Sequence, residues 1–207
     1  MFYTASVLQS EVFMIKFIAA LVFLMSSTAN SSQFTEEVKD KQFVLHLIHN
    51  IWSTEKVQPE IGKAIFLRET RGITNLSSVV GDVSQPRGKR SYGIMQVKVI
   101  TARDVLRNNP MACIKYFKTS RCDKLSTASI VNKLMENMPF NITMAALHYK
   151  RLSNMLPSKM AIAAYNGGVA GVTAKYNHSA FLYANAVTNY AFYLKKVGVD
   201  KQARKIV

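Results

Sequence analysis

The sequence predicts a mostly helical single domain with one small β-hairpin. Apolar residues recur at helical spacing in most segments of the chain. Capping residues, prolines or glycines mark the ends of these segments. One stretch, residues 76–97, instead places turn-forming residues between two β-leaning runs. With 207 residues, 49% of them hydrophobic, the chain is long and apolar enough to bury one core.

The first half of the chain contains two expected helices and the β element. The first helix covers residues 34–52, where six apolar residues follow the helical repeat: Val38, Phe43, Leu45, Leu47, Ile48 and Ile51. The second begins at Pro59, which suits a first turn, and runs to about Glu69 before Gly72 ends it. Residues 76–97 follow as a loop or small hairpin.

The second half of the chain is expected to be mostly helical, with a loop that contains the two cysteines between Pro110 and Ser126. Thr101 and Asp104 resemble a capping box at the start of a short helix that Asn108-Asn109-Pro110 ends. Pro139 is expected to stop the next helix, and Asn141 to cap the one after it. The remaining expected helices cover 126–138, 141–152, 158–166 and 181–197, with Gly167-Gly168 ending the third of these.

The N-terminal region has the pattern of a signal peptide. A positive residue precedes an apolar run over 17–25, which is short for a membrane span, and small residues near Ala29 suit cleavage. We therefore interpret residues 1–29 as a signal peptide, with 1–13 as an extension before the true start, and 30–207 as the mature domain. The alternative is an uncleaved membrane anchor.

The net charge of the chain favours an anionic partner. The chain has 27 Lys+Arg against 12 Asp+Glu, a formal charge of +15, which favours an anionic polymer or surface as partner. The basic residues are scattered and no nucleic-acid-binding motif occurs, so we expect no nucleic-acid partner.

The cysteines and histidines indicate a disulfide rather than a metal site. Two cysteines in an exported protein, Cys113 and Cys122, are expected to form a disulfide that closes a short loop. The alternative is a pair of free thiols. The four histidines form no metal-binding motif, and the cysteine pair lacks further ligands nearby, so no metal is expected.

Glu69 is the strongest candidate for acid chemistry. It follows four apolar residues in the last turn of its expected helix, where the helix dipole disfavours a negative charge. Desolvation by apolar neighbours acts in the same direction, so both effects raise the pKa, as a general acid requires. The alternative is a helix-end glutamate paired with Arg68 or Arg71, a common and weak surface arrangement.

Three other features carry polar groups in apolar or helix-ending positions. Gln96 lies in the apolar run SYGIMQV, Tyr165-Asn166 closes an alanine-rich helix, and Tyr190 lies on the last helix. Taken singly, each has a structural explanation: a satisfied core amide, a helix cap and a core aromatic residue.

In order along the chain, four segments resemble the successive motifs of the soluble lytic transglycosylase family, lysozyme-like enzymes that act on peptidoglycan. The resemblance covers roughly residues 55–175, and its four segments are IFLRETRGITNLSSVVGD, SYGIMQVKVITARDV, NITMAALHYKRL and AIAAYNGGVAGV. It implies a lysozyme-like (α+β) fold. The short exported domain is most similar to the members that serve secretion or conjugation machines in the periplasm.

The resemblance also implies roles for individual residues. Glu69 matches the catalytic acid of the family. The expected substrate-binding residues are Ser78, Met95, Gln96, Tyr165 and Asn166. Three features depart from the family pattern: Thr70 stands where the family has serine, Gly168-Val169 replaces glycine-proline, and residues 81–90 lengthen the connection to the second motif.

Only one strong candidate acid occurs, and the resemblance implies the single-acid, non-hydrolytic cleavage of that family, without a cofactor. The partners implied are peptidoglycan glycan strands and, in the cell envelope, components of a secretion or conjugation complex. Two alternatives remain open at this point. One is a hydrolytic muramidase that uses Asp82 as base, although aspartate is expected in a turn in any case. The other is a catalytically silent glycan-binding assembly protein.

Overall fold

The computed structural model describes residues 40–72, 74, 80–81, 83–173 and 178–197. Apart from residue 40, they belong to one compact unit, Lys41–Val207. The expected signal peptide, residues 1–29, lies outside the described residues, as do Ser78 and Asp82. Among the described helices, none combines the length and apolar character that crossing a membrane requires.

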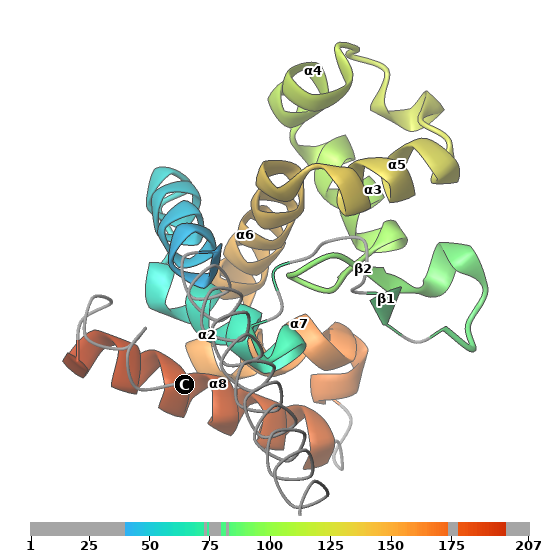
Figure 1. The fold of residues 1–207 in the computed structure, drawn as a ribbon. Coiled ribbons are helices and arrows are strands. Elements are labelled where there is room, and N and C mark those ends of the chain that lie inside the picture. The colour runs from blue at the N-terminus through green and yellow to red at the C-terminus, as the bar shows by residue number, and fades with distance from the viewer. Residues whose placement is uncertain (1–39, 73, 75–79, 82, 174–177, 198–207) are drawn as a thin grey trace, which may run out of the picture. The chain divides into compact units, whose positions relative to one another are not determined.

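The described residues form a mainly helical structure with a small antiparallel sheet, which confirms the predicted secondary-structure class (Figure 1). The helices are 40–54, α2 (Pro59–Thr70), α3 (Val99–Asn108), α4 (Pro110–Phe117), α5 (Thr127–Glu136), α6 (Met138–Met155), α7 (Ser158–Thr173) and α8 (His178–Val197). Short 3-10 turns occur at η2 (Arg87–Lys89) and η3 (Cys122–Lys124).

The sheet has three strands of two residues each, in the order β1-β2-β3. The strands are β1 (Val80–Gly81), β2 (Ser91–Tyr92) and β3 (Val97–Lys98). Gly81 pairs with Ser91, and Ser91 pairs in turn with Lys98, so these residues form one row across the sheet. The expected hairpin is therefore present, with a third strand added after the turn at residues 93–96.

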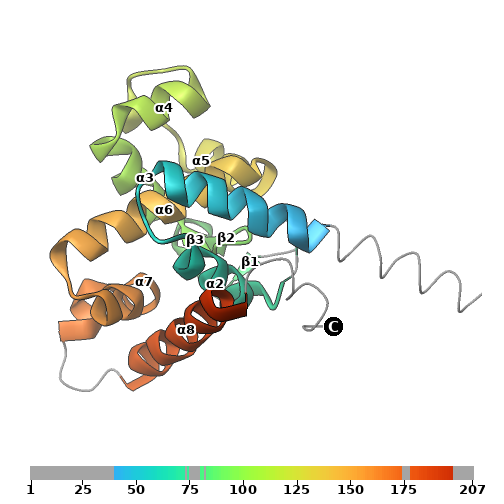
Figure 2. The same ribbon diagram turned by 90° about the vertical axis from the view of Figure 1, so that its left-hand side faces the viewer.

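Helix α8 packs against both α2 and α7, and α7 also packs against α6 (Figure 2). The buried core between the elements includes Phe66 of α2 and Ala184 of α8, both without exposed surface. Trp52, also fully buried, stacks on Tyr149 of α6 with ring centroids 5.4 Å apart. This packing fixes the C-terminal end of α2 next to α7 and α8.

Two helix starts differ from the sequence expectation. Helix α6 begins at Met138, and its cap is Asn137, whose side chain accepts a hydrogen bond from the Phe140 N–H group. Asn141 is therefore not a cap but a buried residue inside the helix. Helix α3 begins at Val99 rather than near Thr101, and no side chain caps it, so the expected capping box is wrong.

Other helix ends lie close to the expected positions. Pro59 occupies the first turn of α2, and that helix ends with Arg71 in a left-handed conformation. Ser126 caps α5. Gly168, with φ of 73°, has non-helical geometry and separates two helical segments within α7, so the segment that begins at Ser158 ends at the expected glycines.

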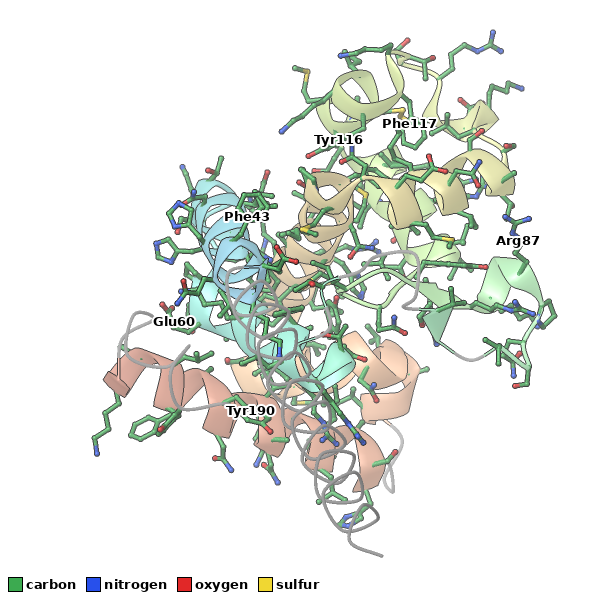
Figure 3. All side chains as sticks on the ribbon, in the orientation of Figure 1. Phe43, Glu60, Arg87, Tyr116, Phe117 and Tyr190 are labelled. Atoms are coloured by element: carbon green, nitrogen blue, oxygen red, sulfur yellow. A yellow bond between two sulfur atoms is a disulfide. The ribbon has the colours of Figure 1, made fainter. Side chains whose placement is uncertain are left out.

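The two cysteines lie on the segment between α3 and α5, where a loop was expected. This segment instead begins with helix α4 and continues to the short turn η3. The structure joins Cys113 of α4 to Cys122 of η3 in a disulfide, with Cα atoms 5.9 Å apart. Tyr116 and Phe117 of α4 (Figure 3) pack edge-on against Phe140 of α6. The bridge and these rings hold α4 against the rest of the domain, away from the candidate site described next.

Candidate active site

A cleft of about 380 Å³ brings together residues from α2, the sheet, α6 and α7. Four of the residues singled out in the sequence line it: Glu69, Gln96, Tyr165 and Asn166. Since these residues come from segments that lie far apart in the sequence, their convergence depends on the tertiary fold. Met95, which was expected to bind substrate, is fully buried and does not line the cleft; its carbonyl oxygen instead accepts a hydrogen bond from the Tyr165 hydroxyl.

Glu69 is the second-last residue of α2 and is half-buried. Desolvation raises the pKa of the Glu69 carboxyl above its ordinary value, and interactions with Tyr183 and Arg68 oppose this shift only in part. Within the described residues, no ion pair joins Glu69 to an arginine. In the described residues Glu69 is therefore not held in an ion pair with an arginine, and its surroundings favour the protonated carboxyl group.

Two tyrosines lie near the Glu69 carboxyl. The Tyr165 hydroxyl donates a hydrogen bond to the Met95 carbonyl oxygen at 2.8 Å. Burial and the nearby Glu69 charge raise the pKa of Tyr165 and of Tyr183 well above 10.0. Both phenols therefore keep their protons at neutral pH. The Tyr165 proton is already donated to Met95, whereas the Tyr183 hydroxyl is available as a donor beside the carboxyl group.

Tyr183 was not among the residues expected from the sequence. It lies on α8 with only 6% of its surface exposed. Its hydroxyl makes no hydrogen bond of standard geometry within the described residues, yet it lies close enough to lower the pKa of Glu69. Tyr190, the tyrosine singled out on this helix, is labelled in Figure 3. It is 44% exposed and does not line the cleft. It is not a core aromatic residue.

A buried asparagine holds the turn that carries Met95 and Gln96. The Asn141 side-chain oxygen accepts from the Met95 N–H group, and its Nδ2 donates to the Tyr92 carbonyl oxygen, both at 2.9 Å. Gly93, with φ of 71°, passes so close to Asn141 that a Cβ atom would overlap the amide. Asn141 therefore links α6 to the wall of the cleft.

Gln96 both stabilises its own turn and lines the cleft. Its backbone is left-handed, with φ of 49°, and its Nε2 donates to the Gly93 carbonyl oxygen at 2.9 Å. The side-chain oxygen lies against Gly81, where a Cβ atom would overlap it. The amide is thus fixed by its own turn while it lines the cleft.

His148 of α6 also lines the cleft, with its ring centroid 5.5 Å from that of Tyr165. Burial lowers the pKa of His148 to about 4, with a further contribution from Arg151. The ring is therefore neutral at neutral pH. His148 lies in the third segment that carries the family resemblance, but nothing in the sequence singled it out as a residue of the cleft.

Of the three features that depart from the resembled motifs, the structure gives a local role to the one at Thr70. Thr70 is buried, and its hydroxyl donates to the Phe66 carbonyl oxygen at 2.8 Å and accepts from the Gly72 N–H group. It stabilises the end of α2 directly after Glu69. Gly168 lines the cleft. The loop after β1 leads into η2, whose charged residues are exposed.

The arrangement is suited to general acid chemistry on a polar ligand. A carboxyl group of raised pKa lies in a cleft with phenol, amide and imidazole groups around it. Among the described residues, no group of three or more His, Cys, Asp or Glu side chains is placed to hold a metal ion. Comparisons with family models, with curated proteins and with solved structures found no match to this chain.

Proposed function

We propose that this chain is a peptidoglycan lytic transglycosylase with a lysozyme-like fold. The observation that carries the proposal is the convergence of Glu69, Gln96, Tyr165 and Asn166 on one cleft. These residues come from three of the four segments that resemble the family's motifs. A chance likeness in sequence would not require their side chains to meet around one carboxyl group of raised pKa.

In the proposed reaction, protonated Glu69 donates its proton to the glycosidic oxygen between N-acetylmuramic acid and N-acetylglucosamine. The bond from this oxygen to C1 of the muramic acid breaks, and the substrate's own acetamido group stabilises the positive charge at C1. Desolvation of Glu69 favours this step, because it favours the protonated carboxyl group from which the proton comes.

The second step returns the proton to Glu69. The carboxylate accepts the proton of the C6 hydroxyl of the same muramic acid, and the hydroxyl oxygen bonds to C1 to give a 1,6-anhydro sugar. Tyr165 and Tyr183 lie close enough to interact with the carboxylate formed between the two steps. Holding the sugar in the required pose gives the internal hydroxyl its advantage over water.

We also propose that the protein acts in the periplasm. Cleavage of glycan strands in the periplasm would follow export by the expected signal peptide. The activity would open the cell wall locally for a secretion or conjugation apparatus. The positive charge of the chain suits an anionic envelope polymer.

Product analysis tests the proposal directly. Purified residues 30–207 are incubated with cell-wall sacculi in water enriched in heavy oxygen, and the released muropeptides are analysed by mass spectrometry. We expect 1,6-anhydromuramoyl ends without heavy oxygen. Reducing ends that carry heavy oxygen would instead indicate a hydrolytic muramidase, and binding without release would indicate a silent glycan-binding protein.

A further inference from the structure

Lys98 places a positive charge in the wall of the candidate cleft. It is the last residue of β3, pairs with Ser91 across the sheet, and directly precedes α3. Its strand neighbour Val97 is buried, whereas Lys98 is exposed, as the alternation of a strand requires. Both Lys98 and Ser91 line the cleft, together with Thr101 from the first turn of α3.

No group in the described part of the chain uses this charge. Lys98 makes no ion pair or side-chain hydrogen bond with any described residue. Arg68, and not Lys98, is the cation that lowers the pKa of Glu69, so the lysine does not serve the acid. The other basic side chain in the cleft lining, His148, is neutral at neutral pH because its pKa is about 4.

We propose that Lys98 is a specificity-determining residue that binds a carboxylate carried by the glycan substrate. This inference rests on the proposed function, which places a muramoyl glycan in the cleft. Muramic acid bears a lactyl group that ends either in a free carboxylate or in a peptide stem with carboxylates of its own. An ammonium group in the wall of the cleft distinguishes such strands from neutral glycans.

Two hydroxyl groups of the cleft lining and the start of α3 also favour the binding of a carboxylate. Ser91 and Thr101 line the same cleft and provide neutral hydrogen-bonding groups. No side chain caps α3, so its first backbone N–H groups add partial positive charge at this end of the cleft. The lysine nonetheless carries the proposal, because it is the group with a full charge and no partner in the described residues.

The test compares steady-state cleavage by the wild type, Lys98→Met, Lys98→Arg and a control, Lys195→Met. Lys195 is an exposed lysine in the last turn of α8 and does not line the cleft. Three soluble substrates are used: glycan strands with peptide stems, the same strands after amidase treatment leaves free lactyl carboxylates, and carboxylate-free oligomers of N-acetylglucosamine. For the last substrate, binding is measured by calorimetry.

We expect Lys98→Met to raise KM about fivefold on at least one carboxylate-bearing substrate, since an exposed charge pair contributes up to ~1 kcal/mol. Its kcat should stay within about twofold of wild type, and Lys98→Arg should restore KM. The affinity for carboxylate-free oligomers should not change. A rise in KM that persists on amidase-treated strands would show that Lys98 binds the lactyl carboxylate. A rise confined to strands with peptide stems would show that it binds a carboxylate of the stem.

Equal KM values for the wild type and Lys98→Met on both carboxylate-bearing substrates would overturn the inference and leave the proposed function standing. An equal loss of affinity for carboxylate-free oligomers, or a loss in Lys195→Met as large as in Lys98→Met, would also overturn it. Absence of cleavage by the wild type on every muramoyl substrate would overturn the proposed function, and the inference with it.

Discussion

Replacing Asn141 by alanine should destabilise the domain and deform the cleft wall together. The substitution removes two hydrogen bonds of 2.9 Å, one from the Met95 N–H group and one to the Tyr92 carbonyl oxygen. Asn141 has no exposed surface, so water does not replace the lost partners in an unchanged structure. A buried group left unpaired costs about 1–3 kcal/mol. For two groups, we expect the free energy of unfolding to fall by about 3 kcal/mol.

Urea unfolding monitored by tryptophan fluorescence measures this loss. The chain has 1 tryptophan, Trp52, which is fully buried and therefore reports on unfolding. The matched control is Asn154→Ala, which makes the same change at an exposed position of the same helix, α6. A stability loss for Asn141→Ala no larger than that of the control would refute the assignment of Asn141 as a buried clamp.

The clamp also predicts an effect on activity. Met95 accepts the hydrogen bond of the Tyr165 hydroxyl through its carbonyl oxygen, and Gln96 follows it in the same turn. Displacing this turn therefore moves Tyr165 and Gln96, which both line the cleft. We therefore expect the remaining folded Asn141→Ala protein to lose activity on sacculi under conditions in which Asn154→Ala retains it. Wild-type activity in a folded Asn141→Ala protein would show that the hydrogen bonds of Asn141 are not needed for the geometry of the cleft.

Two further predictions concern the same region. Gly93→Ala should lower the urea midpoint strongly, because the residue has φ of 71° and its new Cβ would lie 2.8 Å from the Leu134 carbonyl oxygen; an unchanged midpoint would contradict the left-handed turn. Glu69→Gln should stabilise the protein at neutral pH, because the folded state raises the pKa of this carboxyl above 4.5 and so disfavours its charged form. This advantage should shrink as the pH falls through the raised pKa toward 4.5, where the carboxyl becomes protonated in both states, and should be absent below it. Equal urea midpoints at neutral pH would show that Glu69 is not desolvated.

The helix that carries Glu69 could be predicted from the sequence, because its signals are local. Pro59 suits a first turn, and the apolar run before Glu69 predicts a buried face. The start of α6 could not be predicted in the same way. Asn137 and Asn141 have the same capping propensity and lie one turn apart, so only the packing of α6 against the turn at Gly93 distinguishes the cap from the clamp.

The tyrosine beside Glu69 could not be predicted from the sequence either. Tyr183 and Tyr190 lie seven residues apart on α8, close to the same face of an ideal helix. Helical periodicity therefore does not choose between them. The choice depends on where the end of α2 meets α8, which is a tertiary property: Tyr183 is buried near Glu69, and Tyr190 is 44% exposed.

The central claim is that the Glu69 carboxyl group donates a proton to a bound glycan. The most direct test is the rate at which the wild type and Glu69→Gln release soluble muropeptides from purified sacculi. The control is Glu136→Gln, the same change at an exposed glutamate at the end of α5. We predict that Glu69→Gln lowers the rate at least about a hundredfold, the scale of a lost general acid, while Glu136→Gln retains it. Equal rates for the wild type and Glu69→Gln would contradict the claim.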